Sequence, residues 1–259
     1  MIRIATYNVH KCRGMDRRVS VARITEVVAR IDADILAVQE ILRGEDGGAM
    51  GADQVRALAA SLGYQFAFGE TRKHRGAAYG NATFSRFPIT LNQNYDITWR
   101  HRERRGCLRT DVQTGAGETL HIYNVHLGTS MFERPHQVGR LLSEEVLNRR
   151  SLRGPRLVMG DFNDWTRSVA ASLMGSDFES VDLKLLGRRH TYPGILPMLH
   201  LDHFYYDKAL RLMAFSLHRS KLALIASDHL PLVAEFELAA RGTTARPSTA
   251  AGRRDGPTA

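Results

Sequence analysis

The chain has 259 residues, of which 43% are hydrophobic, so it can bury a large core and fits one large domain or two small ones. Its two cysteines, Cys12 and Cys107, give neither a disulfide framework nor zinc-ligand spacing, and no segment approaches the roughly 20 apolar residues of a membrane span. The formal net charge of +9 favours anionic partners such as nucleic acid, nucleotides or phospholipid head groups.

The two ends of the chain indicate an expected location and a tail outside the folded domain. Met1 leads directly into an apolar strand without a signal-sequence pattern, so the expected location is the cytoplasm. Residues 241–259 contain four arginines and one aspartate among small and polar residues, which predicts a disordered basic tail with a net charge of +3. The remaining residues, 1–240, are expected to form one domain with a net charge of +6.

The first half of the sequence alternates apolar strands with amphipathic helices. It predicts, in order, a strand from Ile2 that ends at residues 7–10, a helix over 21–31, a strand over 35–38 that stops at Gln39 and Glu40, a loop over 44–51, a helix capped by Asp53 that runs to Leu62, and a strand over 64–68. Residues 70–79 are basic and contain glycine, which predicts a solvated surface loop, with phosphate contact as the alternative.

The second half is richer in strands. It predicts a strand over 81–89 broken by Pro88, a hairpin of 108–113 with 120–125, a helix through residues 138–146, a strand at 157–159, a helix near 168–174, a strand around 210–215 and a final strand over 230–238. Helices between groups of strands, with a hairpin in the middle, favour an α/β fold of two mixed β-sheets packed face to face with helices outside.

Polar side chains stand at the ends or entrances of these apolar runs: Asn8, Glu40, His126, Asp161, Asn163, Asp202, Asp228 and His229. Ligands of open α/β sheets bind at strand ends, so these side chains are expected to line one cleft. Carboxylates gathered there repel one another, and a divalent cation such as Mg²⁺, which prefers oxygen ligands, would relieve the repulsion. For Asp161 and Asn163 alone, an ordinary turn is an equally good interpretation.

Several short motifs together resemble one known superfamily. They are Thr6-Tyr7-Asn8-Val9-His10, Gln39-Glu40, Tyr79-Gly80-Asn81-Ala82, Arg105-Gly106, Asn124-Val125-His126-Leu127, Gly160-Asp161-Phe162-Asn163, Leu201-Asp202-His203 and Ser227-Asp228-His229-Leu230-Pro231. In this order, over roughly residues 1–238, they resemble the endonuclease/exonuclease/phosphatase (DNase I-like) superfamily, and most closely its small bacterial members with Gly-Asp-Phe-Asn-Asp-Trp, here residues 160–165. The resemblance implies a four-layer α/β sandwich and hydrolysis of a phosphoester with Mg²⁺ or Mn²⁺.

The resemblance also implies roles for individual residues. Glu40 matches the principal metal carboxylate, with Asn8 and Asp228 near the ion, and Asp161 and Asn163 match the pair that orients the attacking water and the phosphate. His229 matches the imidazole on the scissile phosphate, with Asp202 as its carboxylate partner. His126 matches a second phosphate-binding or proton-donating group; Asn81, Arg105 and Tyr192 are candidates for substrate binding. Either Asp161 or His229 could take the proton of the water, and Asp161 is preferred.

Two departures from the family pattern are visible. Some nucleases of the family orient the histidine equivalent to His126 with a carboxylate, but the corresponding place, near residues 79–81, contains no acid. Abasic-site endonucleases place an aspartate where this chain has His10, which argues against that subfamily.

Three functions remain open. The leading one is a metal-dependent phosphodiesterase acting on nucleic acid or a nucleotide, favoured by the positive charge and the basic loops. The second uses the same chemistry on a phospholipid or a small phosphate monoester, although the sequence shows no evident apolar loop long enough to enter a membrane. The third is a binding protein without catalysis, which filled positions at Glu40, Asp161 and His229 disfavour. No obligate protein partner is indicated.

Overall fold

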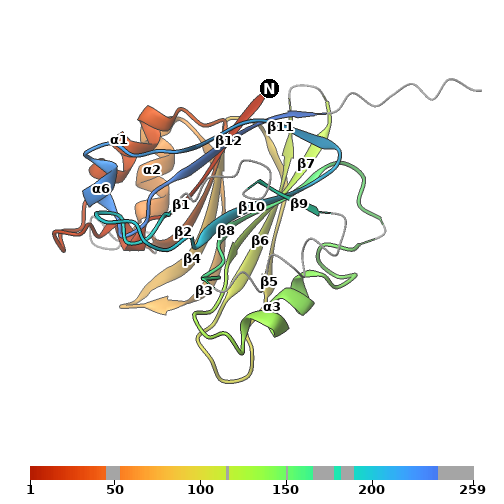
Figure 1. Cartoon of the computed structure of the whole chain (residues 1–259), viewed down its shortest axis with the longest axis horizontal. Helices are drawn as coiled ribbons and strands as arrows, with labels where there is room; N and C mark the ends of the chain where they lie inside the picture. The colour runs from red at the N-terminus through yellow and green to blue at the C-terminus, as the bar shows by residue number, and fades with distance from the viewer. Residues whose placement is uncertain (45–52, 115–116, 150, 166–177, 182–189, 239–259) are drawn as a thin grey trace, which may run out of the picture.

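The computed structural model describes residues 1–44, 53–114, 117–149, 151–165, 178–181 and 190–238. Within these ranges, twelve strands form two six-stranded sheets (Figure 1). The first sheet has the order β11 (Leu210–Leu217), β12 (Leu232–Leu238), β1 (Ile2–Asn8), β2 (Ile35–Arg43), β4 (Ala77–Ser85) and β3 (Gln65–His74). The second has the order β5 (Ile89–Asp96), β6 (Gly106–Gln113), β7 (Thr119–His126), β8 (Arg156–Asp161), β10 (Asp202–Asp207) and β9 (Phe178–Ser180).

Each sheet is antiparallel except for one parallel pair near its centre. β1 runs parallel to β2, and β7 runs parallel to β8. Parallel neighbours end at the same edge of a sheet, and the carboxyl ends of β1, β7 and β8 supply Asn8, His126 and Asp161 of the site. Alternation of apolar residues along the strands directs one set of side chains to the space between the sheets and the other set to the helices.

Helices cover the outer faces of both sheets (Figure 1). On the first sheet lie α1 (Val21–Ile31), α2 (Gln54–Leu62) and α6 (Ala223–Ala226), with the 3-10 helix η1 (His10–Cys12) at the end of β1; α3 (Arg134–Leu141) lies on the second sheet. The Asp53 carboxylate accepts from the backbone N–H of Arg56, which is the predicted cap of α2. No helix within the described ranges is long and apolar enough to cross a membrane.

Three apolar layers hold these elements together. One lies between the first sheet and its helices, the second between the two sheets, and the third between the second sheet and α3 with the turns that follow it. The arrangement is the four-layer α/β sandwich that the sequence predicted. Cys12 and Cys107 are buried free thiols, and burial raises the pKa of Cys12 to about 12, so both act as apolar side chains.

The prediction of a surface loop over residues 70–79 is wrong. These residues continue β3 and β4 as a long hairpin that reverses at Arg75 and Gly76, both with positive φ. The hydroxyl of Thr71 donates to the carbonyl of Tyr79, and the Arg72 guanidinium lies 4.1 Å from the centre of the Tyr79 ring. A partly solvated hairpin carries polar residues on its exposed positions, so its sequence lacks the apolar run of a buried strand.

Other boundaries also differ from the predictions. Residues 81–89 are not one strand, because β4 ends at Ser85 and β5 begins at Ile89 in the other sheet. The helix predicted through Val146 ends at Leu141, and β2 continues past Glu40. Strands β9 and β10 were not predicted; the helix near 168–174, the tail at 241–259 and most of the loop at 44–51 lie outside the described residues.

A buried asparagine on β7 joins the two sheets beneath the site. The side-chain Nδ2 of Asn124 donates to the carbonyls of Val38 (3.1 Å) and Ala82 (2.9 Å), and its Oδ1 accepts from Gln39 Nε2 (2.8 Å). Asn124 is fully buried, and the pairing of β2 with β4 shifts register between Val38 and Ile41, next to the Val38 carbonyl that Asn124 binds. Asn124 therefore fixes the separation of the sheets where the polar residues meet.

We expect Asn124→Leu to lower the free energy of unfolding by about 3 kcal/mol, because two buried carbonyls and one amide lose their partner. Urea denaturation measures this directly. Asn92→Leu, at an exposed position of β5, is the control and should change stability by less than about 0.5 kcal/mol. An Asn124→Leu protein as stable as the wild type would contradict the role of this cross-sheet link.

Candidate active site

The strand pairing places the site residues at one edge of both sheets. At the ends of the parallel pairs, Asn8 lies opposite Gln39 in the first sheet, and His126 lies opposite Asp161 in the second. Asp202 begins the neighbouring strand β10 and pairs with Asp161. The two sheets therefore face each other with polar side chains at the same edge.

Glu40 reaches the site from an irregular part of β2. Its backbone has a φ of 57°, and the pairing of β2 with β4 shifts register between Val38 and Ile41. Left-handed backbone at a glutamate is costly and is common at functional sites. The carboxylate is bound by Asn8 Nδ2 at 3.3 Å and by Lys11 Nζ at 2.8 Å.

The charge of Glu40 is stabilised by its neighbours. Burial acts to raise the pKa of this carboxyl, but the ammonium of Lys11 and the hydrogen bonds from Lys11 and Asn8 outweigh burial and hold the pKa well below its usual range. Glu40 is therefore ionised at neutral pH.

Asp161 lies between two amides at the end of β8. Its Oδ2 accepts from Asn8 Nδ2 and its Oδ1 accepts from the backbone N–H of Asn163, both at 2.9 Å. Gly160 precedes it with a φ of 139°, and a Cβ there would lie 2.0 Å from the Val125 carbonyl oxygen, so only glycine fits. The hydrogen bond from the Asn163 N–H to Oδ1 is the turn contact that the sequence offered as an alternative interpretation. It leaves Oδ2 facing the site.

The protonation of Asp161 reflects opposing effects. Burial and the nearby Asp202 raise its pKa, while His229 and the bond from Asn8 lower it, and the balance is a pKa of about 7. Asn163 itself has a φ of 49° and donates through Nδ2 to the Leu127 carbonyl at 2.9 Å. This bond ties the turn after β8 to the end of β7.

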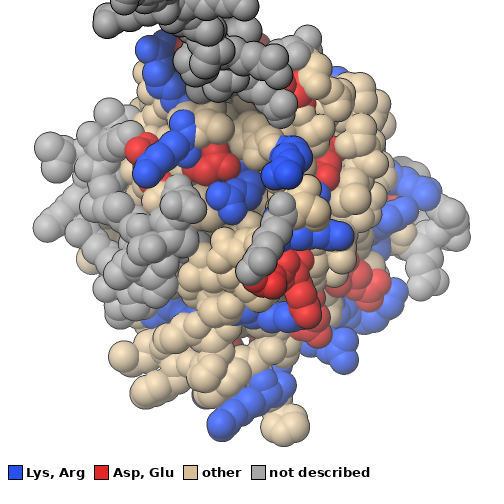
Figure 2. All heavy atoms as spheres, turned by 90° about the vertical axis from the view of Figure 1, so that its right-hand side faces the viewer, with Lys and Arg blue, Asp and Glu red and all other residues tan. Residues whose placement is uncertain are grey.

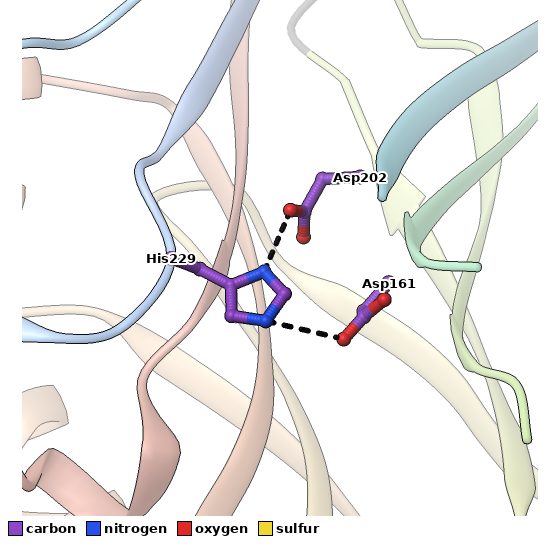
Figure 3. A group of neighbouring side chains, drawn as sticks. All are labelled: Asp161, Asp202 and His229. Carbon is purple, nitrogen blue, oxygen red and sulfur yellow. Dashed lines mark hydrogen bonds and ion pairs between the residues drawn. The ribbon is translucent and has the colours of Figure 1, made fainter. Parts of the chain in front are cut away.

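His229 stands between two carboxylates (Figure 3). Its Nδ1 lies 2.8 Å from Asp202 Oδ2, and its Nε2 lies 3.6 Å from Asp161 Oδ2. Burial opposes protonation, but Asp202 and then Asp161 raise the pKa of His229 to about 10, so the ring is an imidazolium at neutral pH. The ring of Tyr192 lies 5.1 Å from the ring of His229 and forms one wall of the site.

His126 has a different environment. Nη1 of Arg105 lies 3.3 Å from both ring nitrogens, and Nη2 of Arg105 donates to Glu103. The His126 Nε2 is 3.6 Å from Asp161 Oδ2 and 3.9 Å from Glu40 Oε1. Burial and then the Arg105 guanidinium lower the pKa of His126 well below its usual value, so this ring is neutral.

Two other residues of the predicted site have structural partners. Asn81 is buried, and its Nδ2 donates at 3.2 Å to the carbonyls of Gly106 and Asn124, so its amide joins the sheets. Asp228 Oδ2 lies 3.4 Å from Nδ1 of His10. Hydrogen bonds and ion pairs therefore bring together Asn8, Glu40, His126, Asp161, Asp202, His229 and Arg105, with Asp228 at the margin.

Lys11 was not predicted from the sequence. Its ammonium contacts Glu40 at 2.8 Å and lies 5.7 Å from the centre of the Tyr79 ring. The residue belongs to η1, in which His10, Lys11 and Cys12 all have positive φ. A basic residue three positions after Asn8 was the available signal, but the direction of its side chain depends on this unusual turn.

The site contains donors that suit a metal ion. One ligand atom each from Asp161, Asp202 and His229 lies within 4.8 Å of the others, so this buried group could hold a metal. Oδ1 of Asp202 is buried and has no hydrogen-bond partner within the described part of the chain. A carboxylate oxygen without a partner, in a site rich in carboxylates, fits a hard divalent cation.

Comparison with known proteins identifies the family of this chain. The model of the Endonuclease/Exonuclease/phosphatase family matches residues 5–229. The protein YbhP of Escherichia coli K12 is 29% identical over 246 residues, covering 91% of this chain and 96% of YbhP.

Two solved structures share the fold. The mannosyl-6-phosphatase Bt3783 of Bacteroides thetaiotaomicron has a TM-score of 0.74 at 17% identity, covering 92% of this chain and 100% of that one. The human Nocturnin catalytic domain with a bound sulfate anion has a TM-score of 0.70 at 23% identity, covering 92% and 93%. Members of the matched family are hydrolases that act on phosphoester bonds. The match across residues 5–229 means that this chain belongs to the Endonuclease/Exonuclease/phosphatase family.

Proposed function

We propose that this protein is a divalent-metal-dependent phosphoester hydrolase, and that it cleaves a phosphodiester. The observation that carries the proposal is the arrangement of His229 between Asp202 and Asp161, opposite the ionised Glu40. An imidazolium and a carboxylate that face the same small volume can stabilise a phosphoryl group and activate water together.

We assign the metal to the Glu40 end of the site, with Asn8 and Asp228 close to it. The reason is that the hydrogen bond between His229 and Asp202 already uses two members of the buried Asp161, Asp202 and His229 group. Asn8 directs its N–H groups at Glu40 and Asp161 while its Oδ1 accepts from His10, so in this structure it holds the carboxylates in place. When bound, Mg²⁺ or Mn²⁺ would act as a Lewis acid on the phosphoryl oxygens.

Side chains of the protein then carry out the proton transfer and the binding of the phosphoryl group. Asp161 takes the proton of the attacking water, and the backbone bond from Asn163 fixes the direction of its carboxylate. His229 donates from Nε2 to a phosphoryl oxygen while Asp202 maintains its charge and orientation. His126, kept neutral beside Arg105, offers a hydrogen bond to the phosphate and is not the proton donor.

Two classes of substrate are proposed. A nucleic acid or nucleotide remains the proposal drawn from the net charge of the sequence. On the side of the molecule seen in Figure 2, however, Lys and Arg are mixed with Asp and Glu, and the described residues there form no continuous basic track. A phospholipid is the second candidate, because apolar side chains are exposed on loops that leave the site.

We expect EDTA treatment to abolish hydrolysis and added Mg²⁺ or Mn²⁺ to restore it. The assay measures product release from bis(p-nitrophenyl) phosphate, plasmid DNA, RNA, phospholipid and inositol phosphates. Glu40→Gln should raise the metal concentration for half-maximal activity at least about tenfold, since one ligand charge is lost. Glu26→Gln removes an exposed carboxylate of α1 and is the matched control. Full activity of metal-free protein would disprove the proposed metal dependence.

A further inference from the structure

A loop beside His229 presents apolar side chains to solvent. Residues 192–199 contain no charged residue, and the loop closes where the N–H groups of Met198 and Leu199 donate to the Tyr192 carbonyl. The exposed fractions are 56% for Ile195, 65% for Leu196 and 66% for Met198. The sequence did not identify this loop as an apolar protrusion, because a short apolar run is also typical of a buried segment.

Two further segments that follow site residues also expose apolar side chains. The chain that leaves His126 exposes Met131 (56%) and Phe132 (68%), and the chain that leaves Asp161 exposes Trp165 (56%). Arg134 joins these segments, because its Nη1 donates to the Thr129 carbonyl at 2.9 Å and its guanidinium lies 5.8 Å from the Trp165 ring. The apolar tips therefore stand on loops that adjoin His126, Asp161 and His229.

A basic loop adjoins the second group of tips. Trp99 stacks on His136 of α3 with ring centres 4.8 Å apart, and the guanidinium of Arg100 lies 4.9 Å from the Trp99 ring. Arg100, Arg102 and Arg104 are exposed in this loop. Exposed cations beside exposed apolar side chains match the two layers of a membrane surface, its anionic head groups and its acyl chains.

We propose that these loops form a lipid-facing surface, made of residues 99–104, 129–132, 165 and 192–199, which places the site on a bilayer that contains anionic phospholipid. The apolar side chains stand on separate loop tips, and a fluid bilayer can accept each tip independently, whereas a protein partner needs one contiguous complementary patch. Delivery of a lipid phosphodiester to the site by this surface rests on the proposed function. Binding of the protein to vesicles does not depend on that function.

The test is co-sedimentation of the full chain with phosphatidylcholine vesicles, with and without phosphatidylglycerol, at low and high salt. The chain should bind the phosphatidylglycerol vesicles, and Leu196→Ser with Met198→Ser, or Phe132→Ser, should reduce the partition coefficient roughly tenfold or more. These substitutions leave the net charge unchanged. Met213→Ser is the matched control, because this exposed residue lies on β11 near the end of the sheet away from Asn8.

Hydrolysis of soluble bis(p-nitrophenyl) phosphate measures the chemistry of the site without any contribution from membrane binding by the lipid-facing surface. The loop variants should keep the wild-type rate on this substrate and lose rate on vesicles. Absence of vesicle binding by the wild type, equal loss in Met213→Ser, or loss of plasmid DNA binding in the loop variants would overturn the lipid-facing surface. Vesicle binding by a chain that hydrolyses no phosphoester would support the surface and refute the proposed function.

Discussion

His229→Ala is expected to lower kcat by about 10³-fold, with a much smaller effect on the free energy of unfolding. The imidazolium is held by Asp202 at 2.8 Å and faces Asp161 at 3.6 Å, so it occupies the position from which a developing negative charge on phosphate can be bound. Its pKa of about 10 keeps it charged at neutral pH. Removing it leaves the proposed metal and neutral His126 to stabilise the transition state.

One further variant and a rescue experiment show how His229 acts. Asp202→Asn retains an acceptor for Nδ1 but removes the charge that favours the imidazolium, and kcat should fall by about 10²-fold. Added imidazole should restore part of the activity of His229→Ala, since the vacated space can accept the free base. His218→Ala, a partly buried histidine outside the proposed site, is the control and should retain wild-type kcat. A wild-type rate for His229→Ala would remove His229 from the mechanism.

The fold was predictable because regular elements follow local patterns. The apolar residues of α1 recur at helical spacing and Ser20 caps its first turn, while β6 and β7 pair in the predicted hairpin, with Cys107 opposite Val125. The hairpin of β3 and β4 was missed because residues 70–74 of β3 are polar or basic and at least partly exposed. Such strands carry no apolar run for the sequence to show.

For the candidate site, the sequence placed polar residues at strand ends but could not give their contacts. Whether Asn81 points toward substrate or between the sheets depends on a carbonyl of β7, which no local pattern encodes. The contacts of Lys11 with Glu40 and of Arg105 with His126 join residues separated in sequence. Both depend on positive-φ turns or on strand register, so only the assembled fold could show them.

Asp161→Asn is expected to lower kcat by about 10³-fold or more, because the amide cannot take a proton from water. Its carboxylate accepts from Asn8 Nδ2 and from the backbone N–H of Asn163, both at 2.9 Å. An asparagine in this place turns its side-chain NH₂ group toward one of these two N–H donors, so one hydrogen bond is lost. The free energy of unfolding should therefore also fall by about 1–2 kcal/mol. Rates under single-turnover conditions separate the chemical loss from any loss of substrate binding.

Asp207→Asn is the matched control for this experiment. Asp207 is a buried aspartate at the opposite end of β10, and its Oδ2 accepts from the backbone N–H of Arg156 at 2.8 Å. Its substitution removes a charge and a backbone acceptor from the same sheet, so it should lower Tm while kcat stays within about twofold. If Asp161→Asn and Asp207→Asn reduce kcat equally, the loss reflects general destabilisation, and Asp161 is not the base. A large loss in Asp161→Asn alone assigns the proton transfer to the carboxylate at the end of β8.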